Sequence, residues 1–202
     1  MFLGVINVPS VITFLGLILA VVGSILALNQ NLPGAMVCLM FAGLCDFFDG
    51  MVARKMNLSE KEQAFGMHLD SIVDMASFGV APIVIAVGFG LGGNFFDMAL
   101  LVAFSCCAAM RLAYFNVYGL EESGKVSFYT GLPVTFAALI IPLVAMVYFY
   151  VSADMFKNIM RGCYFLIAVL FVLKIPVPKP KGIFYLIFPL SAIGVSAFYL
   201  IQ

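Results

Sequence analysis

Residues 32–54 read LPGAMVCLMFAGLCDFFDGMVAR, and residues 66–90 read GMHLDSIVDMASFGVAPIVIAVGFG. Both stretches are apolar and long enough to cross about 30 Å of hydrocarbon as helices that rise about 1.5 Å per residue. Each nevertheless carries a pair of aspartates. Asp46 and Asp49 lie in the second half of the first stretch, and Asp70 and Asp74 lie in the first half of the second. Ionisable residues within a membrane span are expensive and mark functional sites. These two stretches therefore indicate a membrane protein and the place to look for its chemistry.

The composition of the whole chain agrees with a membrane protein. The 202 residues are 64% hydrophobic and only 10% charged, and the mean hydropathy is +1.16. Soluble domains have about 45–50% apolar and about 25% charged residues. A single water-soluble core, a disordered chain and a nucleic-acid-binding protein are therefore excluded. The ten basic and ten acidic residues cancel, so net charge points to no partner.

Seven apolar runs are expected to form the membrane spans, because a backbone in lipid must satisfy its own hydrogen bonds as a helix. They cover residues 9–28, 32–54, 66–90, 94–117, 131–151, 155–173 and 182–201. The N-terminus lacks a basic region before the first run, so we expect a retained span rather than a cleaved signal peptide. No soluble appendage is left over, and residues 1–202 are predicted to form one integral membrane domain.

The basic residues predict the orientation of these spans. Alternating spans place the loops 55–65, 118–130 and 174–181 on one face. This face holds eight of the ten basic residues: Arg54, Lys55, Lys61, Arg111, Lys125, Lys174, Lys179 and Lys181. The positive-inside rule places that face in the cytoplasm. We therefore expect a multi-pass protein of the cell membrane, with its N-terminus inside and its C-terminus outside.

The spacing of the four aspartates predicts a metal site. Asp46 and Asp49 lie three residues apart, and Asp70 and Asp74 lie four apart, so each pair shares a helical face. Two consecutive antiparallel helices can turn these faces together. Four carboxylates in a low dielectric repel one another, whereas a cluster of oxygen ligands suits Mg²⁺ or Mn²⁺. Asp46 follows about 21 Å of helix, so the cluster is expected near the cytoplasmic headgroups.

Two alternatives concern the surroundings of these acids. The carboxylates could instead pair with cations and hold helices together; the candidate cations are Arg54, Lys61 and Arg111. Small residues next to the acids could pack helices closely or leave room for a ligand. His68 lies two residues before Asp70 and is expected to point away from the acidic face.

These residues resemble a known family. Asp46-x-x-Asp49-Gly50-x-x-Ala53-Arg54, followed by Gly66-x-x-x-Asp70-x-x-x-Asp74, resembles the signature of the CDP-alcohol phosphotransferases at all eight positions. Eleven residues separate Arg54 from Gly66, where the usual pattern has eight. Residues 60–62 are therefore expected to belong to an enlarged loop.

Further stretches resemble the phosphatidylserine synthase branch of that family. They are Ser77–Pro82, Arg111–Asn116 and Gly131–Pro133, with weaker support from Ile175–Pro178 and from Asn7–Ser10 with Thr13. The resemblance implies an all-α bundle of six core transmembrane helices. The seventh run would then be an additional helix, or one run would lie in the interface.

The resemblance also implies a reaction. A CDP-activated lipid would donate its phosphatidyl group, or the ether-lipid equivalent, to the hydroxyl of L-serine, and CMP would leave. Two Mg²⁺ or Mn²⁺ ions would be held by Asp46, Asp49 and Asp70, and Asp74 would accept the serine proton and also touch metal. The residues expected to bind the CDP-lipid are Gly50, Ala53, Arg54 and Gly66. Dimers are common in the family, so a homodimer is expected from the resemblance alone.

The acceptor is less constrained by the sequence. Arg111 is expected at about the same depth in the membrane as the four aspartates. A guanidinium at that depth needs a partner, and a planar bidentate donor suits the carboxylate of serine. An aspartate or a lipid phosphate would be alternative partners, and Asn116 could bind the amino group of serine. Glycerol phosphate or inositol phosphate would be alternative acceptors, favouring more basic residues, which the Lys-rich 174–181 loop could supply by folding back. A cation-coupled transporter is a distant alternative. Its acidic residues would lie near the bilayer centre on repeated halves of the chain, whereas these aspartates lie off-centre and the sequence shows no repeat.

Overall fold

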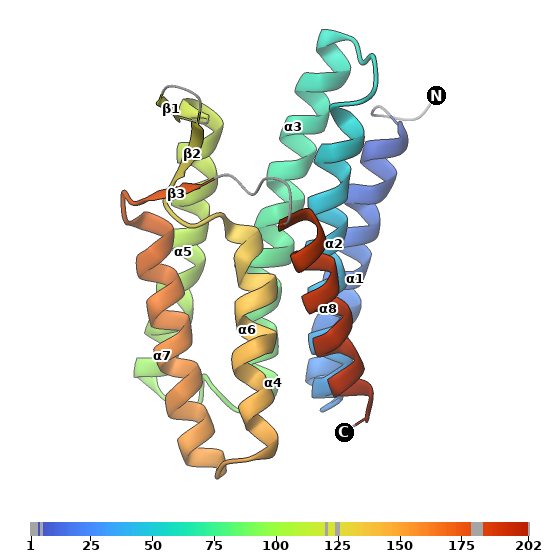
Figure 1. The fold of residues 1–202 in the computed structure, drawn as a ribbon. Helices are drawn as coiled ribbons and strands as arrows, with labels where there is room; N and C mark the ends of the chain where they lie inside the picture. Colours follow the sequence, from blue (N-terminus) through green and yellow to red (C-terminus); the bar gives the residue numbers. More distant parts are fainter. Residues whose placement is uncertain (1–3, 5, 120, 124–125, 179–183, 202) are drawn as a thin grey trace.

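A computed structural model describes residues 4, 6–119, 121–123, 126–178 and 184–201, and it shows a bundle of antiparallel helices (Figure 1). The α-helices are α1 (Val8–Leu28), α2 (Leu32–Ala53), α3 (Glu60–Asp74), α4 (Ala81–Gly88), α5 (Phe95–Tyr118), α6 (Ala137–Ala145), α7 (Ala153–Val172) and α8 (Phe184–Ile201). A π-helical segment, Met75–Val80, joins α3 and α4 into one continuous rod. Two 3₁₀ turns, Val134–Phe136 and Met146–Phe149, extend α6 at its ends.

Each of the seven predicted apolar runs coincides with a helix of this bundle. Five helices are long and apolar enough to cross a membrane: Val8–Leu28, Leu32–Ala53, Glu60–Gly88, Phe95–Tyr118 and Ala153–Val172. Two others, Val134–Phe149 and Pro189–Ile201, are shorter apolar helices of 10–17 residues. Residues 182–183 of the last predicted run lie outside the described part of the chain. The all-α, multi-pass architecture is confirmed. The helical segment Val134–Phe149 is shorter than the predicted run 131–151, whereas α8 covers every described residue of the predicted run 182–201.

Polar caps explain why the helices begin where the sequence breaks. The side chain of a capping residue accepts a backbone N–H of the first turn, which would otherwise lack a partner. The pairs are Asn7 with Ser10, Asn31 with Gly34, Asn94 with Asp97, and Ser152 with Met155. Between α4 and α5, the left-handed backbone of Gly90 and Gly92, with φ of 83° and 96°, turns the chain back.

The prediction of an enlarged loop at residues 55–65 is wrong. Helix α3 begins at Glu60, and Ser59 caps it. The Ser59 side chain accepts from the N–H of Glu62, and the Glu62 carboxylate accepts from the N–H of Ser59 at 2.9 Å. This reciprocal capping box is a strong helix start signal. The extra residues therefore lengthen α3 beyond the expected span instead of enlarging the loop.

The segments expected to be plain loops at 118–130 and 174–181 form a small antiparallel sheet. Its strands are β1 (Glu121–Ser123), β2 (Val126–Thr130) and β3 (Pro176–Pro178), in the order β1-β2-β3. Prolines keep β3 extended, and Thr130 pairs with Pro176. The predicted cytoplasmic residues Lys125, Lys179 and Lys181 lie outside the described residues.

Small residues bring α1 against α2. A Cβ atom built on Gly23 would lie 2.9 Å from the Cβ of Cys38, and one built on Gly16 would lie 3.2 Å from the Cβ of Cys45. These glycines, which could equally have served a dimer contact, are therefore used for packing inside the chain. The five cysteines are free thiols, of which Cys163 is buried and Cys106 is exposed.

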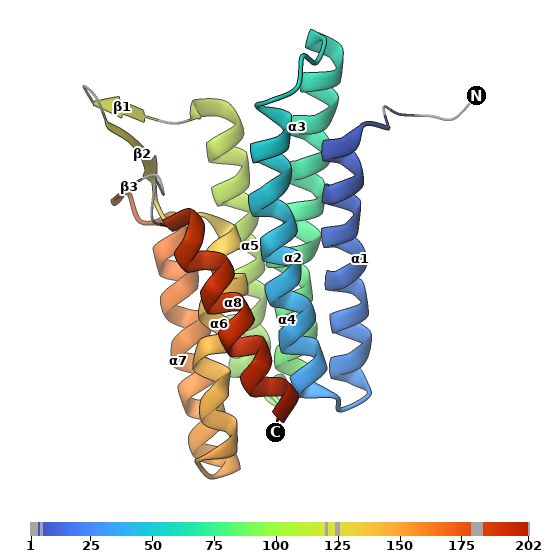
Figure 2. The same cartoon turned by 45° about the vertical axis from the view of Figure 1, so that its right-hand side comes forward.

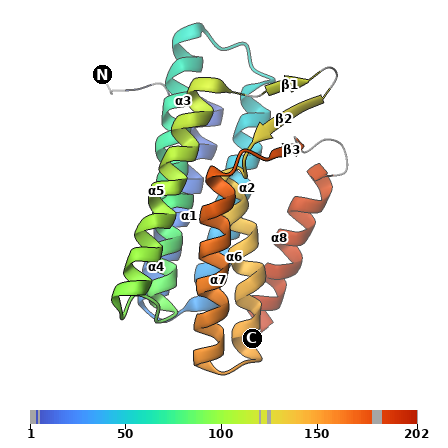
Figure 3. The same ribbon diagram turned by 90° about the vertical axis from the view of Figure 1, so that its left-hand side faces the viewer.

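Aromatic residues hold the second half of the bundle together. Phe104 of α5 packs against Tyr164 and Phe171 of α7. Figure 3 shows α5 and α7 side by side. The buried hydroxyl of Tyr164 donates to the carbonyl of Pro82 in α4 at 2.5 Å. Helix α8 leans across the bundle in Figure 2, and its Tyr199 hydroxyl donates to the carbonyl of Pro142 in α6 at 2.6 Å.

The two ends of the bundle differ in chemistry. The start of α1, the turn between α2 and α3, and the sheet lie together at one end, and the end of α8 lies at the other (Figure 1). This is the arrangement expected for alternating spans with the three loops on one face. The opposite end carries an ion pair in which Arg161 Nε lies 2.6 Å from Asp97 Oδ1.

Candidate active site

Helices α2 and α3 bring the predicted acidic faces together. One carboxylate oxygen from each of Asp46, Asp49 and Asp70 lies within 4.8 Å of the others. The Asp74 carboxyl group lies against that of Asp46. Asp49 and Asp74 are only 5% and 8% exposed. Oxygen ligands this close together suit a hard divalent cation and repel one another without one.

A small cavity inside the cluster fits an ion or a single water. Its volume is about 10 Å³, and all four aspartates line it together with Thr13 and Ser77. The Ser77 hydroxyl is fully buried and has no hydrogen-bond partner. Other helical hydroxyls of the described residues, such as those of Ser24 and Ser71, donate to the carbonyl four residues earlier. An orphaned hydroxyl in a cavity of carboxylates fits a site that binds a cation or a single water.

Two threonine hydroxyls orient carboxylates of the cluster. Thr13 of α1 donates to Asp49 Oδ2 at 2.6 Å, and Thr135 at the start of the α6 segment donates to Asp46 Oδ2 at 2.8 Å. Sequence reasoning noted Thr13 only within the N-terminal motif, and it missed Thr135. Thr135 lies 89 residues from its partner, and no local pattern signals that contact.

A larger cavity opens next to the cluster, between α1, α2 and α3. Its volume is about 430 Å³, and it is bordered by acids at its inner end. Every residue predicted to bind the CDP-lipid lines it: Gly50, Ala53, Arg54 and Gly66. A Cβ atom built on Gly66 would meet no atom within 4 Å, so this glycine faces open space and is not needed for helix packing. Ser10 of the N-terminal motif also lines this cavity, as do Gln63 and Met67, which no sequence motif marked.

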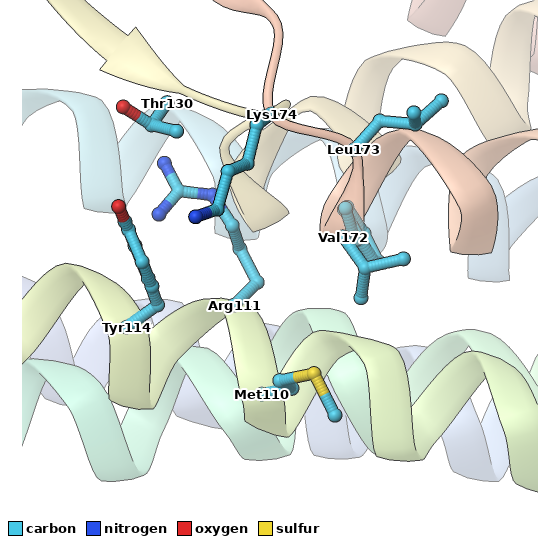
Figure 4. Close-up of a pocket in the computed structure, with 8 residues that line it drawn as sticks. Met110, Arg111, Tyr114, Thr130, Val172, Leu173 and Lys174 are labelled. Atoms are coloured by element: carbon cyan, nitrogen blue, oxygen red, sulfur yellow. The ribbon is translucent and has the colours of Figure 1, made fainter.

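Arg111 lies in a separate cavity of about 150 Å³ under the sheet. Figure 4 shows Arg111, Tyr114, Thr130 and Lys174 directing polar groups toward this space from α5, β2 and the end of α7. Arg111 is 5% exposed, and its Nε donates to the carbonyl of Leu132 at 3.1 Å. Lys174 is the one described lysine of the 174–181 segment, for which the sequence left open that it could fold back toward the site.

Contacts between α5 and the α3–α4 rod fix the depth of Arg111. Ala108 lies beside Gly79, and Asn116 exchanges hydrogen bonds of 2.9 and 3.0 Å with Ser71. Because the two helices run antiparallel, Arg111 lies at the level of the residues just after Asp74. Asn116 contacts α3 from outside the two cavities and lines neither of them. His68 is exposed, in agreement with its predicted orientation.

Comparison with known proteins identifies relatives over most of the chain. A family described as CDP-alcohol phosphatidyltransferase matches residues 6–175. A CDP-diacylglycerol–serine O-phosphatidyltransferase of Bacillus subtilis is 30% identical over 142 residues, which cover 70% of this chain and 76% of that protein. An archaetidylserine synthase of Methanothermobacter thermautotrophicus is 29% identical over 179 residues, covering 88% of this chain and 72% of that protein.

A yeast protein supplies a shorter match. A CDP-diacylglycerol–serine O-phosphatidyltransferase of Saccharomyces cerevisiae is 39% identical over 129 residues, covering 60% of this chain and 44% of that protein. The family match includes both acidic helices, the carboxylate cluster between them and the Arg111 cavity. Together with the geometry of that cluster, the match shows that this chain belongs to the CDP-alcohol phosphatidyltransferase family.

Proposed function

We propose that this protein transfers a phosphatidyl group, or its ether-lipid equivalent, from a CDP-activated lipid to the hydroxyl of L-serine and releases CMP. The observation that carries the proposal is the carboxylate cluster of Asp46, Asp49 and Asp70 at the inner end of a 430 Å³ cavity. The names of the bacterial and archaeal relatives support serine as the acceptor.

The donor would lie in the larger cavity. Its inner wall holds Asp49 and Asp70, where the anionic pyrophosphate would bind through Mg²⁺ or Mn²⁺. Gly50, Ala53 and Gly66 leave room for the nucleotide, and Arg54 supplies a positive charge at the mouth. Bound Mg²⁺ or Mn²⁺ would polarise the phosphorus and stabilise the negative charge on the departing CMP.

Side chains of the protein then accept the proton and position the carboxylates. The serine oxygen forms a bond to the phosphorus of the phosphatidyl group as the bond from that phosphorus to the CMP oxygen breaks. Asp74, buried beside Asp46, takes the proton of the serine hydroxyl. Thr13 and Thr135 hold the Asp49 and Asp46 carboxylates in place.

The serine carboxylate would bind in the Arg111 cavity. Arg111 and Lys174 line this cavity, and Tyr114 and Thr130 add hydroxyl groups. The level of Arg111 next to that of Asp74 supports this assignment, because serine must present its carboxylate and hydroxyl within a few ångströms of each other. Asn116 is the weaker candidate for the amino group, since it already pairs with Ser71.

One assay tests this proposal. Purified protein is supplied with CDP-diacylglycerol, Mn²⁺ or Mg²⁺, and one acceptor at a time, and both CMP release and the lipid product are measured. Serine is expected to support turnover, whereas glycerol 3-phosphate and inositol phosphate are not. Turnover with either phosphate acceptor and none with serine would assign the protein to another activity of the same family.

The proposal places the reaction at the cytoplasmic face of the cell membrane. Asp46 and Asp49 lie in the last turns of α2, close to the turn between α2 and α3. That turn lies at the same end of the bundle as the sheet (Figure 1). Most basic residues of the chain fall on the predicted cytoplasmic face at that end. A homodimer stays a prediction of the family resemblance.

A further inference from the structure

One short segment connects the Arg111 cavity with the carboxylate cluster. Thr130 lines the Arg111 cavity, and Thr135, five residues later, binds a carboxylate of the cluster. Between them, the carbonyl of Leu132 accepts the hydrogen bond from Arg111 at 3.1 Å. The 131–135 segment is therefore the shortest covalent connection between the basic cavity and the acidic cluster.

The start of this segment is anchored firmly to the end of α7. The N–H of Gly131 donates to the carbonyl of Ile175 at 2.8 Å, and that of Leu132 donates to the carbonyl of Leu170 at 3.0 Å. Gly131 has a φ of 82°, and a Cβ atom there would lie 3.0 Å from the carbonyl oxygens of Phe171 and Leu173. Only glycine fits such a backbone at such a close approach. The position of the segment is thus set by backbone contacts.

The other end of the segment acts on a single oxygen atom. Thr135 Oγ1 donates to Asp46 Oδ2 at 2.8 Å, which occupies one oxygen of that carboxylate and fixes the rotation of the group. Asp46 also lies against Asp74, so its rotation decides which oxygen faces the other acids. A hydrogen bond to a ligating carboxylate commonly changes metal affinity by about 10- to 100-fold.

We propose that Thr135 is a positioning residue, whose hydroxyl orients the Asp46 carboxylate for divalent cation binding and links it through the 131–135 segment to Arg111. This inference rests on the proposed function for the identity of the metal site. It predicts that loss of the Thr135 hydroxyl weakens metal binding even when no substrate is present.

The experiment measures Mn²⁺ binding to the full-length protein in detergent by calorimetry or electron paramagnetic resonance, together with its melting temperature. Thr135→Val, which keeps the shape and removes the hydroxyl, should weaken Mn²⁺ binding by about 10-fold or more. Thr135→Ser keeps the hydroxyl and should stay within about threefold of the wild type. Ser24→Ala is the matched control, because the Ser24 hydroxyl donates only to the Ala20 carbonyl of its own helix.

The outcomes separate this inference from the proposed function. Unchanged Mn²⁺ affinity in a folded Thr135→Val protein, or equal losses in the Val and Ser variants, would overturn the role of the hydroxyl. If the Val variant does not fold, Thr135→Ala is compared with Thr135→Ser by the same criterion. A wild-type protein that binds no Mn²⁺, or an Asp46→Asn variant that binds it normally, would instead refute the metal centre itself.

Discussion

Gly66 is a residue whose role in ligand binding can be tested without disturbing helix packing. It belongs to the family motif, yet an added Cβ atom would meet no neighbour within 4 Å. Gly162 on α7 has the same open surroundings but lies outside both cavities. A larger side chain at either position should leave the fold intact, because leucine has a higher helix propensity than glycine.

The first prediction compares these two glycines. Gly66→Leu should raise the KM for CDP-diacylglycerol by about 10-fold or more, because the leucine side chain would fill space assigned to the nucleotide. A tenfold change corresponds to a loss of about 1.4 kcal/mol in affinity. Gly162→Leu should leave this KM unchanged, and neither variant should lower the melting temperature. Steady-state kinetics with varied donor check this. Equal donor kinetics in the two variants would show that Gly66 takes no part in binding the CDP-lipid.

Arg111 is the second residue whose role can be isolated. Its guanidinium binds the Leu132 carbonyl and lines the cavity assigned to serine. At saturating CDP-lipid, Arg111→Lys should raise the serine KM by about 10- to 100-fold, because a hydrogen bond to a charged group contributes about 1.5–3 kcal/mol. Lys157→Gln, at the other end of the bundle near Gly90, should have no effect.

Which kinetic constant changes in the Arg111→Lys variant decides the role of Arg111. A raised KM for serine with unchanged donor affinity supports a contact with the acceptor. A raised KM for the donor with unchanged serine kinetics would assign Arg111 to a phosphate of the CDP-lipid instead. A lowered melting temperature with both KM values intact would make it a structural residue.

At the scale of helices and strands, α1 approaches the α3–α4 rod through Gly88. A Cβ atom on Gly88 would lie 2.6 Å from the carbonyl oxygen of Ala27, a backbone atom that cannot rotate away. Gly88→Ala should therefore destabilise the protein by about 1–3 kcal/mol through overpacking. Thermal unfolding in detergent tests this, with Gly162→Ala as the control. An unchanged melting temperature would show that α1 shifts freely against α4.

The acidic faces were predictable because their signal is local. Asp46 with Asp49, and Asp70 with Asp74, obey helical spacing within one span each, and two consecutive antiparallel helices leave few ways to arrange them. The start of α3 is also encoded locally, in the capping box of Ser59 and Glu62, which the prediction of an enlarged loop did not take into account.

The sheet and its consequences were not predictable in the same way. Strand β2 has β-forming residues in its sequence VSFYT, but its partner β3 is only the triplet PVP, and the pairing joins residues such as Thr130 and Pro176 that lie far apart in the chain. The Thr135–Asp46 contact likewise depends on where the sheet anchors the 131–135 segment. Tertiary packing alone decides such contacts, so the sequence located the acids but missed part of their support.

At the scale of the whole molecule, the count and order of the apolar helices followed from hydropathy, whereas their exact lengths did not. The orientation in the membrane rests on the distribution of basic residues. Asn57 lies in the turn between α2 and α3, and Gly93 lies at the opposite end between α4 and α5. These two positions are exposed and suit a labelling test.

The orientation predicts which position is accessible from outside an intact cell. In a cysteine-free background, Gly93→Cys should react with a membrane-impermeant maleimide on intact cells. Asn57→Cys should react only after lysis. The reverse pattern would place the carboxylate cluster at the outer face and contradict a cytoplasmic reaction.

The central claim is that the four aspartates act by holding divalent cations, and the dependence of CMP release on such cations tests it most directly. Exhaustive chelation with EDTA should abolish CMP release from CDP-diacylglycerol and serine, and added Mn²⁺ or Mg²⁺ should restore it. Asp70→Asn should insert into the membrane and fold but regain no activity at the cation concentration that restores the wild type, since it removes one of the clustered ligand oxygens. Full activity after chelation, or a normally active Asp70→Asn protein, would contradict the account.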